Sequence, residues 1–313
     1  MNPVSAAVVL FSVLFPTKAW FTPEQPILID VRAEAPVSLA LTDFAGKPFD
    51  ARESVEVPEA RTVDVRALYQ TLQMPGTYIL YAVPKDADLS QFVGTPLVIS
   101  VRRDVRRDAP PTAMVIHVSP LRYAVMETDK GEITIAFYHD VAPHTAENFL
   151  LLAAGGYFDG LTFHRIVPEF VIQSGDPRGD GSGGPGYRIN AEFSDRAHDL
   201  GTLSMAREED PIEKQGAAPR AEYADSGGSQ FFICLKRTRQ LDRRFTVFGK
   251  VTAGLDAVRA IGATPVGGEQ GDVPQEKVSI RRVTVRPVTR ENNPYVGLLS
   301  TESEPAAPEK PKE

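Results

Sequence analysis

One segment of alternating residues, Phe163–Pro177, constrains the fold of this chain more than any other part of it. Residues at every second position share one face of a β-strand, so the segment predicts a strand with two different faces. The apolar face carries Ile166, Phe170 and Ile172. Arg165, Val171 and Gln173 share the other face, which sets a permanent cation and an amide beside an apolar side chain. This pattern indicates a pocket wall, and an ordinary strand with a solvated arginine is the alternative.

The composition excludes several classes of function. The 313 residues are enough for about two domains, and 42% apolar and 24% charged residues are typical of a soluble globular protein. The net charge of -7 argues against nucleic-acid binding, which needs a basic face. A single cysteine, Cys234, leaves no thiolate pair for a disulfide or a zinc site, and the five histidines lack metal-ligand spacing. We therefore expect no metal.

The first 19 residues are a candidate signal peptide. Val4–Phe15 is apolar but too short to span a bilayer, so no stable membrane insertion is expected. Thr17–Ala19 has the small-x-small form that a signal peptidase accepts. A signal peptide would make the protein exported, periplasmic or extracytoplasmic, and otherwise it is cytoplasmic. The alternative structural interpretation is a strand or an extension that packs on the following domain.

Residues 20–103 predict a small all-β domain of immunoglobulin-like, β-sandwich kind, because short strand-like runs alternate with turn residues. The runs are Ile27–Val31, Val37–Leu41, Thr62–Val65, Thr77–Val83 and Leu97–Val101. Residues 104–117 are charged and contain Pro110 and Pro111, which is typical of a stiff linker. No catalytic constellation is found in this half of the chain.

Residues 118–288 predict a second, strand-rich domain with two helices. A hairpin is expected around Asp129–Gly131, and helices over Thr145–Ala154, with Thr145 as the cap, and Leu255–Ile261. The last segment, 289–313, is rich in Glu and Pro and predicts a disordered tail.

Several separated blocks of this second region resemble, in order, the cyclophilin family of peptidyl-prolyl cis/trans isomerases. They are Tyr138–Pro143, Thr145–Phe149, Arg165–Gln173, Leu203–Ala206, Gly228–Ile233, Leu241–Asp242 and Val247–Val251. The resemblance covers about Tyr123 to Val288. It implies a mainly β fold, a closed eight-stranded antiparallel barrel with two helices, preceded here by the small β domain.

The resemblance also implies the activity and its residues. Arg165 and Gln173 are the expected catalytic residues, with Arg165 donating to the proline nitrogen of a twisted Xaa-Pro amide. The expected substrate-binding residues are Phe170, Val171, Ala206, Arg207, Gln230, Phe232, Leu241 and Phe245. Proline-containing polypeptides are the expected partners, folding assistance the expected role, and no cofactor is needed. The alternative is a proline-peptide binding module or chaperone with little turnover, and the oligomeric state is not predicted.

Four features depart from the family pattern. Gln240 stands where the family often has a tryptophan that contacts cyclosporin, Phe245 where it often has histidine, and Val171 where a methionine is common. Glu208–Asp225 is a long insertion, interpreted either as a tolerated surface loop or as a segment that selects substrates. A basic rim is expected to pair with it, formed by Lys236, Arg237, Arg239, Arg243 and Arg244. Gly179–Gly184 fits G-x-G-x-x-G, but Pro185 follows where a helix should begin, so no nucleotide site is predicted.

Overall fold

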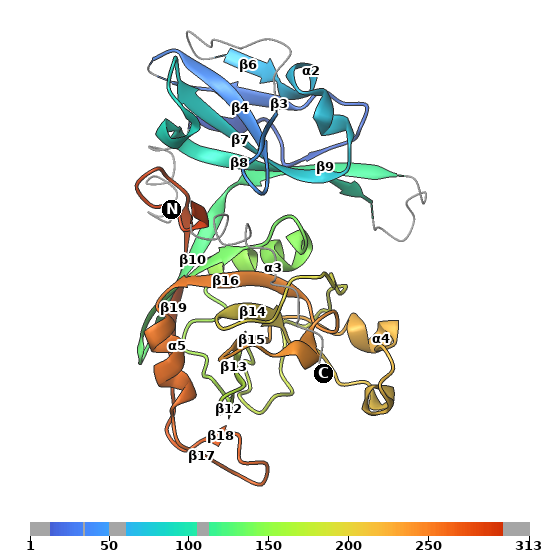
Figure 1. Cartoon of the computed structure of the whole chain (residues 1–313), viewed down its shortest axis with the longest axis vertical. Helices are drawn as coiled ribbons and strands as arrows, with labels where there is room; N and C mark the ends of the chain where they lie inside the picture. The colour runs from blue at the N-terminus through green and yellow to red at the C-terminus, as the bar shows by residue number, and fades with distance from the viewer. Residues whose placement is uncertain (1–12, 34, 50–60, 105–112, 297–313) are drawn as a thin grey trace, which may run out of the picture.

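A computed structural model of the chain describes residues 13–33, 35–49, 61–104 and 113–296. The described residues are mainly β, as expected, with few helices. Figure 1 shows the amino-terminal sheets above a curled eight-stranded sheet, with β9 leading into β10 between them. No helix in these ranges is long and apolar enough to cross a membrane.

The amino-terminal region forms two antiparallel sheets that enclose one apolar core. The larger has the order β2-β9-β8-β7-β4-β5 and consists of β2 (Trp20–Phe21), β9 (Met114–Pro120), β8 (Val93–Arg103), β7 (Gly76–Pro84), β4 (Val37–Asp43) and β5 (Pro48–Phe49). The smaller is β1 (Leu14–Pro16), β3 (Leu28–Val31) and β6 (Arg61–Asp64), and short helices lie at α2 (Val65–Leu68), η1 (Gln70–Gln73) and η2 (Leu89–Gln91). All five predicted strands are present, while the immunoglobulin-like class stays a prediction.

The second sheet has eight antiparallel strands in the order β12-β13-β15-β14-β16-β11-β10-β19. They are β12 (Arg165–Val167), β13 (Val171–Ser174), β15 (Phe231–Cys234), β14 (Thr202–Met205), β16 (Val247–Ala253), β11 (Gly131–Phe137), β10 (Arg122–Thr128) and β19 (Ile280–Pro287). The remaining elements are α3 (Pro143–Ala154), α4 (Ala221–Ala224), α5 (Leu255–Gly262), η3 (Pro211–Gln215), η4 (Arg239–Leu241), β17 (Val266–Gly267) and β18 (Val273–Pro274). The edge strands β12 and β19 share no ladder in the described residues, so the strand ladders alone form a curled sheet.

The predicted hairpin and helices of this region are confirmed, with one correction. β10 and β11 pair across a turn that ends at Gly131, whose φ of +130° suits glycine. The helix α3 begins at Pro143, two residues before the expected start, because proline is favourable in the first turn. Thr145 is therefore inside the helix and is not its cap. The carboxylate of Glu192 accepts the amide hydrogens of His144 and Thr145 instead.

The strand β7 contacts two cores, which explains its unbroken apolar run. Tyr78, Leu80 and Ala82 point into the core between the two amino-terminal sheets. Ile79, Tyr81 and Val83 point the other way, into a core shared with the eight-stranded sheet, because side chains alternate along a strand. The eight-stranded side contributes Leu121, Tyr123, Val125, Ala136, Tyr138, Val247 and Val288 to this shared core.

The shared core corrects two of the predicted boundaries. Met114–His117, expected in the linker, belongs to β9 and pairs with β8. Tyr295, expected in the disordered tail, is 1% exposed and packs edge-on against Phe44. Its hydroxyl donates to the carbonyl of Arg122 at 2.8 Å and accepts the amide hydrogen of Phe137 at 3.1 Å. Residues 289–296 are thus part of the fold, and 297–313 lie outside the described residues.

The amino-terminal segment contributes a strand to the smaller sheet. Leu14–Pro16 pairs with β3, and Leu14 is 2% exposed. This agrees with the interpretation of that part of the segment as a packed strand. Residues 1–12, which hold most of the candidate signal peptide, and most of the expected linker lie outside the described residues.

Candidate active site

The hairpin of β12 and β13 brings Arg165 and Gln173 together. The two residues are direct partners in the antiparallel register, so their side chains leave the sheet on the same face. The Nη1 of Arg165 donates to the Oε1 of Gln173 at 3.3 Å, and its Nε donates to the Oδ2 of Asp272 at 2.8 Å. The predicted pair is therefore juxtaposed, and Asp272, which sequence reasoning missed, fixes the guanidinium from its other side.

A chain of amides continues from Gln173 across the site. Its Nε2 donates to the Oε1 of Gln230 at 2.9 Å, and the Nε2 of Gln230 donates to the carbonyls of Gly181 and Gly183 at 2.9 and 2.8 Å. The glycine-rich segment thus holds this amide in place. Successive hydrogen bonds from Asp272 through Arg165 to Gln230 restrict the rotamers of all these side chains.

An apolar slot lies beside the guanidinium. Its cavity, of about 480 Å³, is lined by Arg165, Phe170, Val171, Gln173, Ala206, Arg207, Phe232, Gln240, Leu241 and Phe245, together with Glu209, Glu213, Lys214 and Arg244. Phe232 is 5% and Val171 2% exposed, and the ring of Phe245 meets that of Phe232 edge-on at 5.5 Å. Such a cavity accepts a small apolar ring next to a hydrogen-bond donor.

The structure corrects the expected place of Phe170. Continuous alternation puts Phe170 on the face of Ile166 and Ile172, but the chain turns between Val167 and Val171 and starts a new strand. The amide hydrogen of Phe170 is donated to the carbonyl of Val167 at 3.0 Å. Since the turn breaks the period of two, the Phe170 side chain joins the slot rather than the core that contains Ile166 and Ile172.

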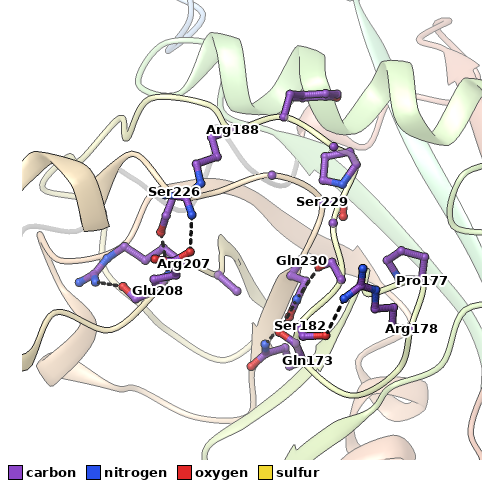
Figure 2. Close-up of a pocket in the computed structure, with 18 residues that line it drawn as sticks. Gln173, Pro177, Arg178, Ser182, Arg188, Arg207, Glu208, Ser226, Ser229 and Gln230 are labelled. Carbon is purple, nitrogen blue, oxygen red and sulfur yellow. Dashed lines mark hydrogen bonds and ion pairs between the residues drawn. The ribbon is translucent and has the colours of Figure 1, made fainter.

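A second cavity, of about 710 Å³, adjoins the slot and shares Gln173, Ala206 and Arg207 with it. Figure 2 shows Arg178, Ser182 and Gln230 on one side of it and Arg188, Glu208 and Ser226 on the other. All ten predicted site residues line one or both cavities. The amide hydrogen of Ala206 is donated to the carbonyl of Gln230 at 2.9 Å, so this N–H is not available to a ligand.

A buried histidine supports the slot from behind and was also missed. The ring of His198 stacks on Phe232 at 6.1 Å, its Nδ1 lies 3.0 Å from Asp242 and its Nε2 lies 3.1 Å from the hydroxyl of Ser204. Burial lowers the pKa of His198 below its ordinary value, although Asp242 opposes the shift. Despite burial, which acts to raise it, the hydrogen bonds from Arg237 and His198 lower the pKa of Asp242 to about 2. His198 is thus a neutral structural ring near pH 7.

The single cysteine is buried in the same apolar cluster as Phe232. Burial raises the pKa of the Cys234 thiol to about 12, so it stays protonated near pH 7. No group of three or more His, Cys, Asp or Glu side chains in the described ranges has the arrangement of a metal site.

Comparison with known proteins gives a family for this site. The family model "Cyclophilin type peptidyl-prolyl cis-trans isomerase/CLD" matches residues 123–285. A peptidyl-prolyl cis-trans isomerase of Synechococcus elongatus is 46% identical over 127 residues, which cover 41% of this chain and 78% of that protein. Isomerase B of Bacillus subtilis is 43% identical over 136 residues, 43% of this chain and 85% of that protein.

A solved structure is similar to about half of this chain. It is a cyclophilin-type isomerase of Cryptosporidium parvum, determined in the presence of the dipeptide Ala-Pro, at 27% identity and a TM-score of 0.46. The match covers 53% of this chain and 99% of that one. With the family match spanning Arg165, the slot and the amide chain, this chain belongs to the cyclophilin-type peptidyl-prolyl cis-trans isomerases.

Proposed function

We propose that the slot binds the proline ring of a polypeptide while Arg165 stabilises the twisted amide of the Xaa-Pro bond. Amide resonance opposes rotation with a barrier of about 18–20 kcal/mol. When the bond twists, conjugation is lost and the proline nitrogen becomes a hydrogen-bond acceptor. A donor that bonds only to the twisted form lowers the barrier, and each 1.36 kcal/mol is about tenfold in rate.

The placement of the guanidinium is the single observation that carries this proposal. Arg165 is fixed by Asp272 at 2.8 Å and Gln173 at 3.3 Å, yet its side chain stays 40% exposed at the mouth of the slot. Its Nη2 has no partner among the described residues, which leaves a donor for the substrate. Pre-orientation of a donor is the usual source of electrostatic catalysis, because no reorganisation is needed as the charge develops.

Gln173 and the apolar residues have complementary roles in this proposal. Gln173 orients Arg165 and the peptide carbonyl, while Phe170, Val171, Phe232, Leu241 and Phe245 enclose the proline ring. Gln230 and the backbone of Ala206 and Arg207 flank the substrate chain. The reaction needs no cofactor, since no covalent bond is made or broken.

We also propose that the eight-stranded sheet closes into a barrel. Residues 160–163 precede β12, and residues 278–280 lead into β19. The amide hydrogen of Gly160 is donated to Ile280 at 2.8 Å and that of Phe163 to Val278 at 3.0 Å, with one bridge between Thr162 and Ser279. These bonds support closure by the segments next to the two edge strands.

The proposal is tested by exchange spectroscopy on a short Ala-Pro peptide with about one protein per hundred peptides. We expect cis–trans exchange much faster than the uncatalysed tens of seconds. A protein that binds the peptide, seen as shifted protein resonances, without accelerating exchange would instead be a proline-binding module.

We expect Asp272→Asn to lower kcat about tenfold and to leave KM within about twofold. The amide keeps the size of the carboxylate but loses the charged bond that orients Arg165. The measurement is the same exchange rate as a function of peptide concentration. Glu276→Gln removes an equal charge four residues away, from a side chain that is 58% exposed, and is expected to change neither constant. Equal effects of the two variants would contradict the orienting role.

A further inference from the structure

The insertion Glu208–Asp225 is a folded unit and not a loose loop. It contains η3 and α4, and the first of these begins with a reciprocal capping box between Asp210 and Glu213. Asp210 is 0% exposed, and both of its carboxylate oxygens accept hydrogen bonds from the Arg220 side chain at 2.9 Å. A tolerated surface loop needs no such internal ion pair, because its backbone can be solvated.

One residue of the insertion, Glu213, is joined to the active site through Arg207. The two form a bidentate ion pair, with N–O distances of 2.7 and 2.9 Å, and their side chains are only 9% and 2% exposed. The remaining bonds of this guanidinium go to the carbonyl of Arg244 at 3.0 Å and that of Glu208 at 2.8 Å. Arg207 is therefore held rigidly and is electrically paired.

The paired guanidinium covers the ring of Phe245. The Cζ of Arg207 lies 4.4 Å from the centre of that ring, and the ring in turn meets Phe232. Glu209, Glu213 and Lys214 of the insertion line the same cavity. The insertion is thus one wall of the slot, and Glu213 determines whether that wall presents a paired or an unpaired arginine.

The arginines of the basic rim do not all pair with the insertion. Arg244 makes the expected kind of contact, with Glu213 at 3.4 Å and the carbonyl of Gly216 at 3.3 Å. Arg237 pairs with Asp242 and Asp199, and Arg243 pairs with Asp195. The coupling between the insertion and the slot therefore runs chiefly through Arg207, which is the residue just before the insertion.

We propose that Glu213 is a positioning residue that sets the charge selectivity of the isomerase, by pinning Arg207 on Phe245 and cancelling its charge. This inference rests on the proposed function, because it takes the slot as the site of the proline ring. While the ion pair is intact, Arg207 adds no preference for acidic over basic residues next to the proline. Removing Glu213 leaves the charge of Arg207 unbalanced, and removing Arg207 leaves the charge of Glu213 balanced only by Arg244, so the two changes favour opposite substrates.

The test uses peptides Xaa-Ala-Pro-Xaa in which both Xaa are Glu or both are Lys, and the readout is the ratio of their kcat/KM values. Glu213→Gln leaves Arg207 unpaired, so we expect the Glu-to-Lys ratio to rise about tenfold at low salt. Arg207→Gln leaves Glu213 with only its longer contact to Arg244 at 3.4 Å, so we expect the ratio to fall, by a smaller factor. Both shifts should shrink at about 0.5 M salt, because exposed charges are then screened.

Glu222→Gln is the matched control. It lies in the same insertion and removes the same charge, but its side chain is 67% exposed and outside both cavities. We expect its ratio to match that of the wild type. A merely structural role of Glu213 would lower both rates together and leave the ratio unmoved, which would overturn the inference, as would shifts of the same sign in the two slot variants. A wild-type protein that accelerates neither peptide would refute the proposed function instead.

Discussion

Replacing Arg165 with alanine is expected to lower kcat/KM for Xaa-Pro isomerisation by about 10²–10³-fold, the usual effect of deleting one transition-state donor. The loss should lie in kcat. The apolar slot that holds the proline ring keeps its walls in this variant, because Phe232 and Val171 pack without the arginine. Peptide affinity, measured by chemical-shift titration, should stay within a few fold of the wild type.

Two further variants make this result specific. Arg165→Lys keeps the charge but not the planar fork that reaches Asp272 and the substrate together, so we expect it to recover little of the rate. Arg282→Ala removes an exposed arginine on β19 and should leave the rate unchanged. An Arg165→Ala protein that is folded and retains most of its kcat would remove Arg165 from the mechanism.

The largest expected effect on stability comes from a residue far from the slot. We expect Tyr295→Ala to lower the free energy of unfolding by about 3–5 kcal/mol, as for other large aromatic-to-alanine changes in a core. The ring is 1% exposed, and its loss also leaves the amide hydrogen of Phe137 and the carbonyl of Arg122 without their partner. Urea unfolding provides the measurement.

Two probes, one for each region of the protein, make the Tyr295 experiment more informative. Trp20, the single tryptophan, reports on the amino-terminal sheets by fluorescence, and isomerase activity reports on the slot. Because one core joins both regions, we expect both transitions to coincide in the wild type and to shift together in the variant.

Tyr295→Phe, which loses only the hydroxyl, should lower the free energy of unfolding by about 1–3 kcal/mol. Val296→Ala, at a side chain that is 65% exposed, should cost less than about 0.5 kcal/mol. Separate transitions would contradict the coupling.

Local signals account for the parts of the fold that were predicted from sequence. The strands of the amino-terminal sheets, the Asp129–Gly131 turn and the helix near Leu255 each depend on short-range patterns of alternation, turn residues and helical spacing. The errors arose where distant residues decide. Glu192 caps α3 from 47 residues away in place of Thr145, and Tyr295 is ordered by a core that the tail composition does not reveal.

The same distinction applies to the site. Eight of the ten predicted residues stand in recognisable blocks, with Arg207 and Phe245 close beside them, and the structure places all ten around two adjoining cavities. Asp272 was missed because it reaches Arg165 across 107 positions in the sequence, with no motif of its own. Neither the pairing of Arg207 with Glu213 nor the stacking of Arg207 on Phe245 could be predicted, since both depend on the tertiary fold.

The burial of both faces of β7 indicates that the isomerase domain depends on the amino-terminal sheets for its solubility. Ile79, Tyr81 and Val83 cover Tyr123, Val125 and Tyr138, which would otherwise be surface. The cyclophilin-type domain expressed alone would expose this hydrophobic patch of aromatic and branched side chains to water. Such a protein would be prone to self-association. The isomerase domain is therefore not expected to be soluble on its own. Its transfer to another protein would require polar residues in place of Tyr123, Val125 and Tyr138.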